Sequence, residues 1–143
     1  MLFRSPPTPK YRYLTKVVLK SFPAKKGDGT DWDAGFPGPE PDVILRIRYA
    51  DNSWSMNTTE MLNLTNASLP KYFSYDMYGI KLTNVNWAID VLDNDPPALG
   101  MPPTQENMAT TAAFNPATAA PSSTGVITLS APGASFEIWF AEY

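Results

Sequence analysis

The stretch DVILRIRY at residues 42–49 decides the fold, because an apolar side chain recurs at every second position from Val43 to Tyr49. Val43, Leu45 and Ile47 fall on one face of an extended chain, whereas the two arginines fall on the other. A period of two is typical of a β-strand with one face buried and one face in water. This segment is therefore expected to be a half-buried strand.

The same alternation recurs along the chain, at Trp87, Ile89 and Val91 and again near the C-terminus. We expect further strands at residues 15–22, 53–58, 72–76, 79–82, 87–92, 125–130 and 135–142. No window shows an apolar stripe of period 3.6 with caps, and 15 prolines interrupt any long helix. The sequence predicts an all-β fold, an antiparallel two-sheet β-sandwich of seven or eight strands with Greek-key connections.

The chain of 143 residues fits a single domain. Residues 1–10 hold three prolines and no periodic pattern, so we expect an extended arm that precedes one sandwich domain at 11–143. Residues 96–124, rich in Pro, Ala and Thr, are expected to form a long loop, with a weak strand near 108–114 as an alternative. Such a loop either docks on a neighbouring subunit or is simply flexible.

The composition excludes several classes of function. Without Cys or His, the chain has no disulfide, no Cys/His zinc site and no nucleophile activated by histidine. The net charge is −3, and the basic residues do not form a stripe with supporting aromatics, so nucleic acid is not an expected partner. No run of about 18 apolar residues is present, and the N-terminus lacks the apolar stretch of a secretion signal. We therefore expect a soluble protein.

Acidic side chains gather in two loops that lie far apart in the sequence. They are Asp28, Asp31, Asp33 and Asp42 in the first loop, and Asp90, Asp93 and Asp95 in the second. Carboxylates at such short intervals can direct several oxygens at one point, which suits Ca2+ because it takes six to eight oxygen ligands. The alternative is that these aspartates only build turns, which their side chains favour.

The segments SFPAKKGDGTDWDAGFPGPEPDVILRI and WAIDVLDNDPPALG resemble the calcium-dependent C2 domain family. The resemblance covers most of residues 13–143 and is closer to the C2-like domains of extracytoplasmic Bacteroidota proteins. It implies that Ca2+ is held by Asp33, with Asp31 as a substitute, together with Asp42 and the pair Asp93 and Asp95. It also implies a location outside the cytoplasm.

The chain departs from the family pattern at one position. The family often has another acid shortly after the Asp pair, where this chain has Ala98 in DPPALG. The resemblance therefore implies a single, weakly bound Ca2+ rather than several ions. Low-affinity extracellular modules bind Ca2+ with dissociation constants of about 0.1 to 1 mM.

Several surfaces offer alternative roles. The side chains beside the acidic positions either touch a membrane or pack under their loops; they are Trp32, Phe36, Leu99 and Met101. A carbohydrate would stack on aromatic side chains, for which the candidates are Trp54, Tyr72, Tyr75 and Tyr78. Catalysis is not expected, because no feature of the sequence raises the proton affinity of one carboxyl above that of its partner. We expect a non-catalytic binding, adhesive or assembly module, with a protein partner or self-assembly favoured; a carbohydrate-binding module and a structural subunit are the alternatives.

Overall fold

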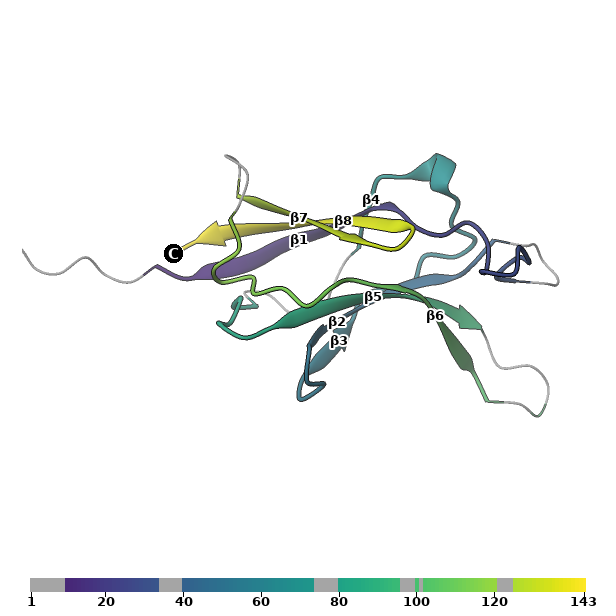
Figure 1. Ribbon diagram of the computed structural model, residues 1–143, viewed down its shortest axis with the longest axis horizontal. Helices are drawn as coiled ribbons and strands as arrows, with labels where there is room; N and C mark the ends of the chain where they lie inside the picture. Colours follow the sequence, from purple (N-terminus) through teal and green to yellow (C-terminus); the bar gives the residue numbers. More distant parts are fainter. Residues whose placement is uncertain (1–9, 34–39, 74–79, 96–99, 101, 121–124) are drawn as a thin grey trace, which may run out of the picture.

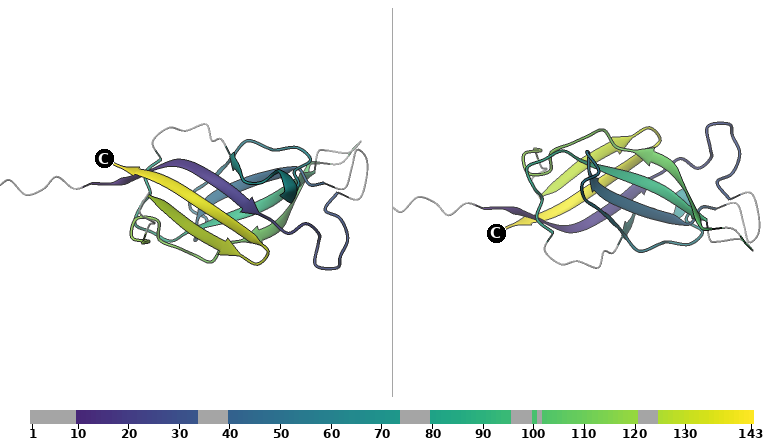
Figure 2. Two further views of the ribbon diagram at one scale, coloured as in Figure 1. Left: turned by 90° about the horizontal axis from the view of Figure 1, so that it is seen from above. Right: turned by 90° about the horizontal axis from the view of Figure 1, so that it is seen from below.

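Two four-stranded antiparallel sheets pack face to face in the computed structural model, which describes residues 10–33, 40–73, 80–95, 100, 102–120 and 125–143. One sheet has the order β4-β1-β8-β7, formed by β1 (Arg12–Ser21), β4 (Lys71–Phe73), β7 (Val126–Ala131) and β8 (Ala134–Glu142). The other has the order β3-β2-β5-β6, formed by β2 (Val43–Tyr49), β3 (Ser55–Asn57), β5 (Trp87–Asp95) and β6 (Thr104–Thr110). The two layers are distinct in Figure 1, and Figure 2 shows each from its outer side. The predicted β-sandwich is confirmed, with eight strands in the described residues.

The core lies between the sheets and is built from the inward positions of alternating strands. Its most fully buried side chains come from both layers, among them Phe136 and Ile138 of β8 and Trp87 and Ile89 of β5. Burial of apolar area on this scale is the main stabilising contribution of a sandwich, because each large side chain adds about 1.5 to 3 kcal/mol. A single short 3-10 helix, η1 (Asn66–Ser68), interrupts the strands in the part of the chain that is described.

Strands β2 and β5 form the centre of the second sheet in a register without irregularity, from Val43 opposite Asp93 to Tyr49 opposite Trp87. Val43, Leu45 and Ile47 are fully buried, as their alternation predicts. Because side chains opposite each other lie on the same face, Asp93 is on the core side of β5, at the end of the row that begins with Trp87. The pairing therefore brings a carboxylate to the open end of the core.

The outer face of the same two strands carries a second buried carboxylate, Asp90. Its Oδ2 accepts hydrogen bonds from Nε of Arg46 and from Nε of Arg48, both at 2.8 Å. Thr110 of β6 donates its hydroxyl to Oδ1 at 2.6 Å. Burial opposes the charge of Asp90, but the hydrogen bonds from Arg48, Thr110 and Arg46 outweigh it, and the pKa lies below its usual value.

The structure corrects two expectations about strands. Residues 96–124 are not one long loop, since Thr104–Thr110 form the edge strand β6. Hydrophobic alternation did not identify this strand, because its sequence TQENMAT is mostly polar and its register against β5 shifts between Val91 and Leu92. Residues 80–82, the described part of the strand expected at 79–82, do not form a strand; among them only Lys81 pairs, as an isolated bridge to Tyr13.

The two ends of the sandwich differ. Near the C-terminus, Tyr11 and Tyr143 exchange backbone hydrogen bonds of 2.8 and 3.0 Å. The predicted arm at residues 1–10 lies outside the described residues, apart from Lys10. At the opposite end, β1 runs into the first acidic loop, β2 begins and β5 ends (Figure 1). The two acidic segments therefore meet at one end of the molecule.

We predict that Asp90→Asn lowers the free energy of unfolding by about 2 kcal/mol, because a charge held by two guanidinium groups is replaced by a neutral amide. Urea unfolding at pH 7 measures the effect. The matched control is Asp51→Asn, in an exposed turn where Oδ1 accepts the Ser53 N–H; its amide keeps that acceptor, and its stability should change by less than about 0.5 kcal/mol. Equal stability of the two variants would contradict the prediction.

Candidate cation site

The first acidic loop is held in shape by its own turn and by Trp32. Asp28 accepts hydrogen bonds from the Thr30 N–H at 2.9 Å and from the Thr30 hydroxyl at 2.6 Å, so this aspartate builds a turn. The Trp32 side chain is buried, and its ring N–H donates to the carbonyl of Pro23 at 2.7 Å. Of the two expectations for Trp32, packing under the loop is therefore the one that the structure supports. This anchor fixes the start of the segment that carries Asp33.

The second set of carboxylates comes from the last residues of β5. Asp93 continues the core face of the strand and is 0% exposed, whereas Asp95, two residues later, is partly exposed. Oδ1 of Asp93 accepts the backbone N–H of Asp42 at 3.1 Å. Oδ2 of Asp93 is buried and has no hydrogen-bond partner among the described residues. A buried carboxylate oxygen without a donor is costly, because the group has lost water and gained nothing in exchange.

Asp33, Asp93 and Asp95 meet at this end of the sandwich. One carboxylate oxygen from each residue lies within 4.8 Å of the other two. The three side chains come from the first loop and from β5, so only the fold brings them together. This separation is short enough for one cation with metal–oxygen distances of about 2.3 to 2.6 Å to touch all three.

Burial and mutual repulsion raise the pKa values of two of these groups. For Asp33, burial, a hydrogen bond with Asp95 and the negative charges of Asp93, Asp95 and Asp42 raise the pKa to about 7. For Asp93, burial and then the charge of Asp95 raise the pKa to about 6, and the Asp42 N–H opposes the shift. Two carboxyl groups can hydrogen-bond to each other only if one carries a proton. A proton therefore substitutes for a cation near neutral pH.

Asp42 lies beside the cluster and supports it. Its backbone N–H donates to Asp93, its carbonyl accepts the Asn94 N–H at 2.8 Å, and its Oδ1 accepts the Asn63 N–H at 2.8 Å. Its charge contributes to the raised pKa values of both Asp33 and Asp93. Asp42 thus positions Asp93 and adds negative potential.

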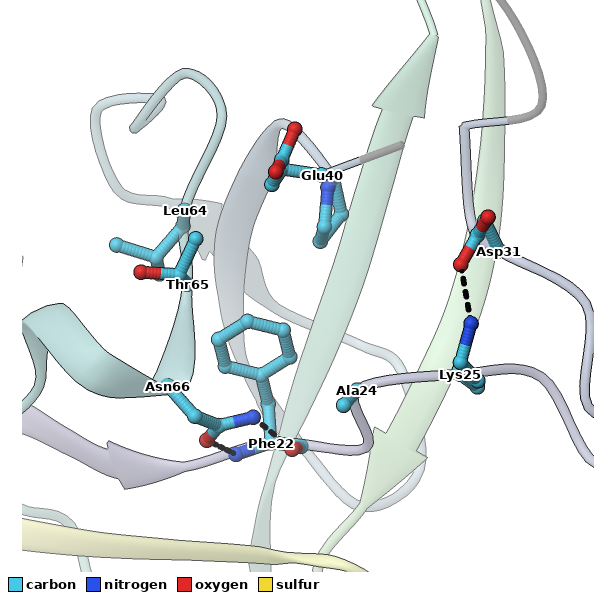
Figure 3. A pocket seen from close by; sticks show the side chains of 9 residues that line it. Phe22, Ala24, Lys25, Asp31, Glu40, Leu64, Thr65 and Asn66 are labelled. Atoms are coloured by element: carbon cyan, nitrogen blue, oxygen red, sulfur yellow. Dashed lines mark hydrogen bonds and ion pairs between the residues drawn. The ribbon is translucent and has the colours of Figure 1, made fainter. Parts of the chain in front are cut away.

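Asp31 takes a different direction from the other predicted ligands. Its carboxylate pairs with Lys25 at 2.6 Å, and both residues line a pocket of about 230 Å³ between the first loop and the segment around η1. Figure 3 shows this ion pair on one side of the pocket and Glu40 on another, with the side chain of Asn66 bonded to the backbone of Phe22. Asp31 is not one of the three converging residues.

Two charged side chains beside the cluster, Lys26 and Glu106, were not predicted from the sequence. Lys26 forms an ion pair of 2.8 Å with Glu106 of β6, and this hydrogen bond, together with the charges of Glu106, Asp93 and Asp28, raises the pKa of Lys26. The charge of Glu106 also adds to the raised pKa of Asp93. Glu106 was missed because its segment was expected to be a loop. The only available signal was an acid inside a short polar stretch between prolines and Met108.

The surfaces considered for other ligands are only partly described. Phe36, Leu99, Met101, Tyr75 and Tyr78 lie outside the described residues. Trp54 packs against Tyr49 and Trp87 with ring centroids 5.2 and 5.4 Å apart. Tyr72 on β4 is 64% exposed. The described candidates therefore do not form one aromatic platform on the same element.

Comparison with family models, with curated proteins and with solved structures finds no match. In the described part of the chain, no helix is long and apolar enough to cross a membrane.

We predict that, in a chelating buffer, stability falls as the pH rises from 5 to 7.5. The folded-state pKa values of Asp33 and Asp93 are raised above those of the unfolded chain, so in this range the folded state binds more protons and loses stability as they dissociate. Asp93 alone contributes roughly 1 kcal/mol over this interval. The chain has no histidine to mask the effect. Urea unfolding at a series of pH values measures the slope, and a flat or rising profile would contradict the prediction.

We further predict that Asp93→Asn stabilises the protein in chelator at pH 7.5, by about 1 to 2 kcal/mol or roughly 3 to 6 °C in melting temperature. The amide keeps the acceptor for the Asp42 N–H and removes one of the repelling charges. It also places an N–H₂ donor beside the carboxylates of Asp33 and Asp95. Thermal unfolding monitored by circular dichroism tests this. A loss of stability similar to that of Asp90→Asn would show that Asp93 is not repelled by its neighbours.

Proposed function

We propose that this protein is a non-catalytic β-sandwich binding module of the C2-like type, whose acidic loops hold one Ca2+ ion. One observation carries the proposal: Asp33, Asp93 and Asp95 converge within 4.8 Å, and the buried Oδ2 of Asp93 has no donor among the described residues. A cation supplies the missing partner and removes the repulsion within the cluster. Asp42 and Glu106 add negative potential around it.

The ligand chemistry favours Ca2+ among the common cations. The cluster offers only hard oxygen ligands, and the chain has no Cys or His for softer metals. Three carboxylates leave several positions for water and backbone carbonyls, which the flexible coordination of Ca2+ accepts. Mg2+ suits the site less well, because it requires near-octahedral geometry with metal–oxygen distances of about 2.0 to 2.1 Å and loses its bound water reluctantly.

The raised pKa values also invite a catalytic interpretation, since acid–base enzymes use paired carboxyls. The raised pKa values were not expected from the sequence, because no feature of the sequence indicated a carboxyl group with a raised proton affinity. Burial argues against catalysis by Asp93, which is 0% exposed. The pocket beside the first loop is lined by Asp31 and Glu40 and not by the three converging residues. We therefore keep the non-catalytic proposal.

The bound ion would act on the end of the sandwich as a whole. It would tie the loop that contains Trp32 and Asp33 to the end of β5, and so present a rigid surface to a protein partner. A weak site of this kind is filled where Ca2+ is near millimolar, as it is outside cells. This supports an extracytoplasmic place of action for a binding, adhesive or assembly module.

We predict that Ca2+ at about a hundred times its dissociation constant stabilises the folded protein by roughly 2.7 kcal/mol, a melting shift of about 5 to 10 °C. The comparison is between chelator and excess Ca2+ at pH 7.5. The variant Asp93→Asn/Asp95→Asn should keep its fold and lose the shift, because the amides preserve shape and remove the attracting charge. Asp51→Asn, the matched control away from the cluster, should keep it.

A direct binding measurement tests whether a cation occupies the site, independently of its effect on the stability of the fold. Tb3+ occupies oxygen-rich Ca2+ sites, and Trp32 adjoins Asp33 in the sequence, so excitation of tryptophan should produce Tb3+ emission that Ca2+ displaces. Emission that survives in the double variant, or an unchanged melting temperature in Ca2+, would refute the proposed site.

A further inference from the structure

Among the described strands, four lie at sheet edges, and they differ in how well they are protected from pairing with another chain. The edges are β3 and β4, with three residues each, β6 and β7. Short strands, charges, prolines and bulges are the usual protections of an edge. Length protects β3 and β4, and β6 carries Glu106 and a register shift. The sequence of β7, VITLSA, has six residues with no charge and no proline, and its register against β8 is regular.

The hydrogen-bonding groups of β7 that face outward follow from its pairing with β8. The two strands are joined by Pro132 and Gly133, with Ala131 opposite Ala134. At the other end, Phe140 N–H donates to the carbonyl of Gly125 at 3.1 Å. Since bonded and non-bonded pairs alternate in an antiparallel ladder, residues 127, 129 and 131 bond to β8. The backbone groups of residues 126, 128 and 130 therefore point to the free edge.

No hydrogen bond joins these outward groups to another described residue. The side chains of β7 also suit an extended sheet. Ile127 is buried on the core side and Leu129 is packed beside it, while Thr128 and Ser130 are exposed on the outer side. On the outer side these hydroxyl residues follow Val126, which is 7% exposed. A further strand would lengthen the apolar row inside and cover the two exposed hydroxyl residues outside.

We propose that β7 is a self-association edge, which pairs antiparallel with β7 of a second copy about a two-fold axis at Thr128. In this register Val126 lies opposite Ser130 of the second copy, and Thr128 lies opposite Thr128. In this register all three outward-facing residues form hydrogen-bonded pairs with the second copy. A shift of one residue would place them opposite residues whose backbone groups point the other way, toward β8. A shift of two residues would leave one of the three without a partner. Ile127 and Leu129 of the two copies meet in the close, non-bonded positions. A second copy of this chain is therefore the partner that we assign to this edge, because the β7 sequence pairs with itself in this register.

The cation site contributes no residue to this edge, so the two proposals stand or fall separately. A joint of one strand pair is small compared with the interfaces of permanent dimers, and we expect association that depends on concentration between about 10 µM and 1 mM. Sedimentation of the intact chain over this range should show a monomer–dimer equilibrium. A strict monomer at the highest concentration would overturn the proposal.

A cysteine experiment tests the register, because the chain has no native Cys. In Thr128→Cys, the two thiols sit on the axis, with Cα atoms about 5.5 Å apart, within the range of a disulfide. In Ser130→Cys, the matched control on the same exposed edge, the two thiols are displaced by four residues, or about 13 Å, and cannot join. Under mild oxidation, covalent dimer should form several-fold faster in Thr128→Cys than in Ser130→Cys. Equal rates, or no dimer in either variant, would overturn the register.

A charge variant provides the opposite test. Thr128→Lys places two like charges directly opposite each other across the axis, which opposes pairing. Because Thr128 is exposed, the monomer should keep its circular dichroism spectrum and melting temperature at low concentration. Loss of the dimer in sedimentation supports the proposal. A dimer that persists in this folded variant would show that the copies meet on another surface.

Discussion

The structure depends on the strict alternation of side chains along the paired strands β2 and β5. Val43, Leu45 and Ile47 must face the core, and the regular register then sends the odd-numbered residues of β5 to the same side. That row begins with Trp87 and ends with Asp93. A shift of the pairing by one residue would turn the whole row outward. The burial of a carboxylate at the end of the core is therefore enforced by the apolar residues before it, and the acidic cluster is built on that constraint.

The two buried aspartates of β5 show how the environment decides what a carboxylate does. Both Asp90 and Asp93 are 0% exposed, and they lie on opposite faces of one strand. Asp90 receives two guanidinium groups and a hydroxyl, which hold its charge and lower its pKa. Asp93 receives one backbone N–H and is surrounded by other acids; burial, and then the charges of these acids, raise its pKa to about 6. The first is a completed structural ion pair, and the second is short of positive charge, which is the condition that a bound cation relieves.

Strands could be predicted where apolar and polar residues alternate in the sequence, and could not be predicted where they do not. The all-β class and the strands around Val43–Tyr49, Trp87–Asp95 and Ala134–Glu142 follow from period-two apolar patterns. Strand β6 could not be found this way, because it pairs on one side only and presents mostly polar side chains. At the site, Asp33 of the first acidic loop meets the Asp93 and Asp95 pair of the second, and the binding of a cation there stays a prediction. The diversion of Asp31 to Lys25 depends on side-chain directions that spacing does not encode.

The contacts between the first loop and the β7–β8 hairpin show how the two proposed surfaces share one scaffold. Gly133, at the hairpin tip, has φ of 76°, and a Cβ added there would lie 3.0 Å from the ring of Pro23. The carbonyl of Pro23 in turn accepts the ring N–H of Trp32, the neighbour of Asp33. The hairpin tip is thus packed against the loop that carries Asp33, while the outer edge of β7 runs away from it along the side of the sandwich. A glycine without a side chain allows this close approach, so the loop that carries Asp33 and the strand β7 belong to one packed framework.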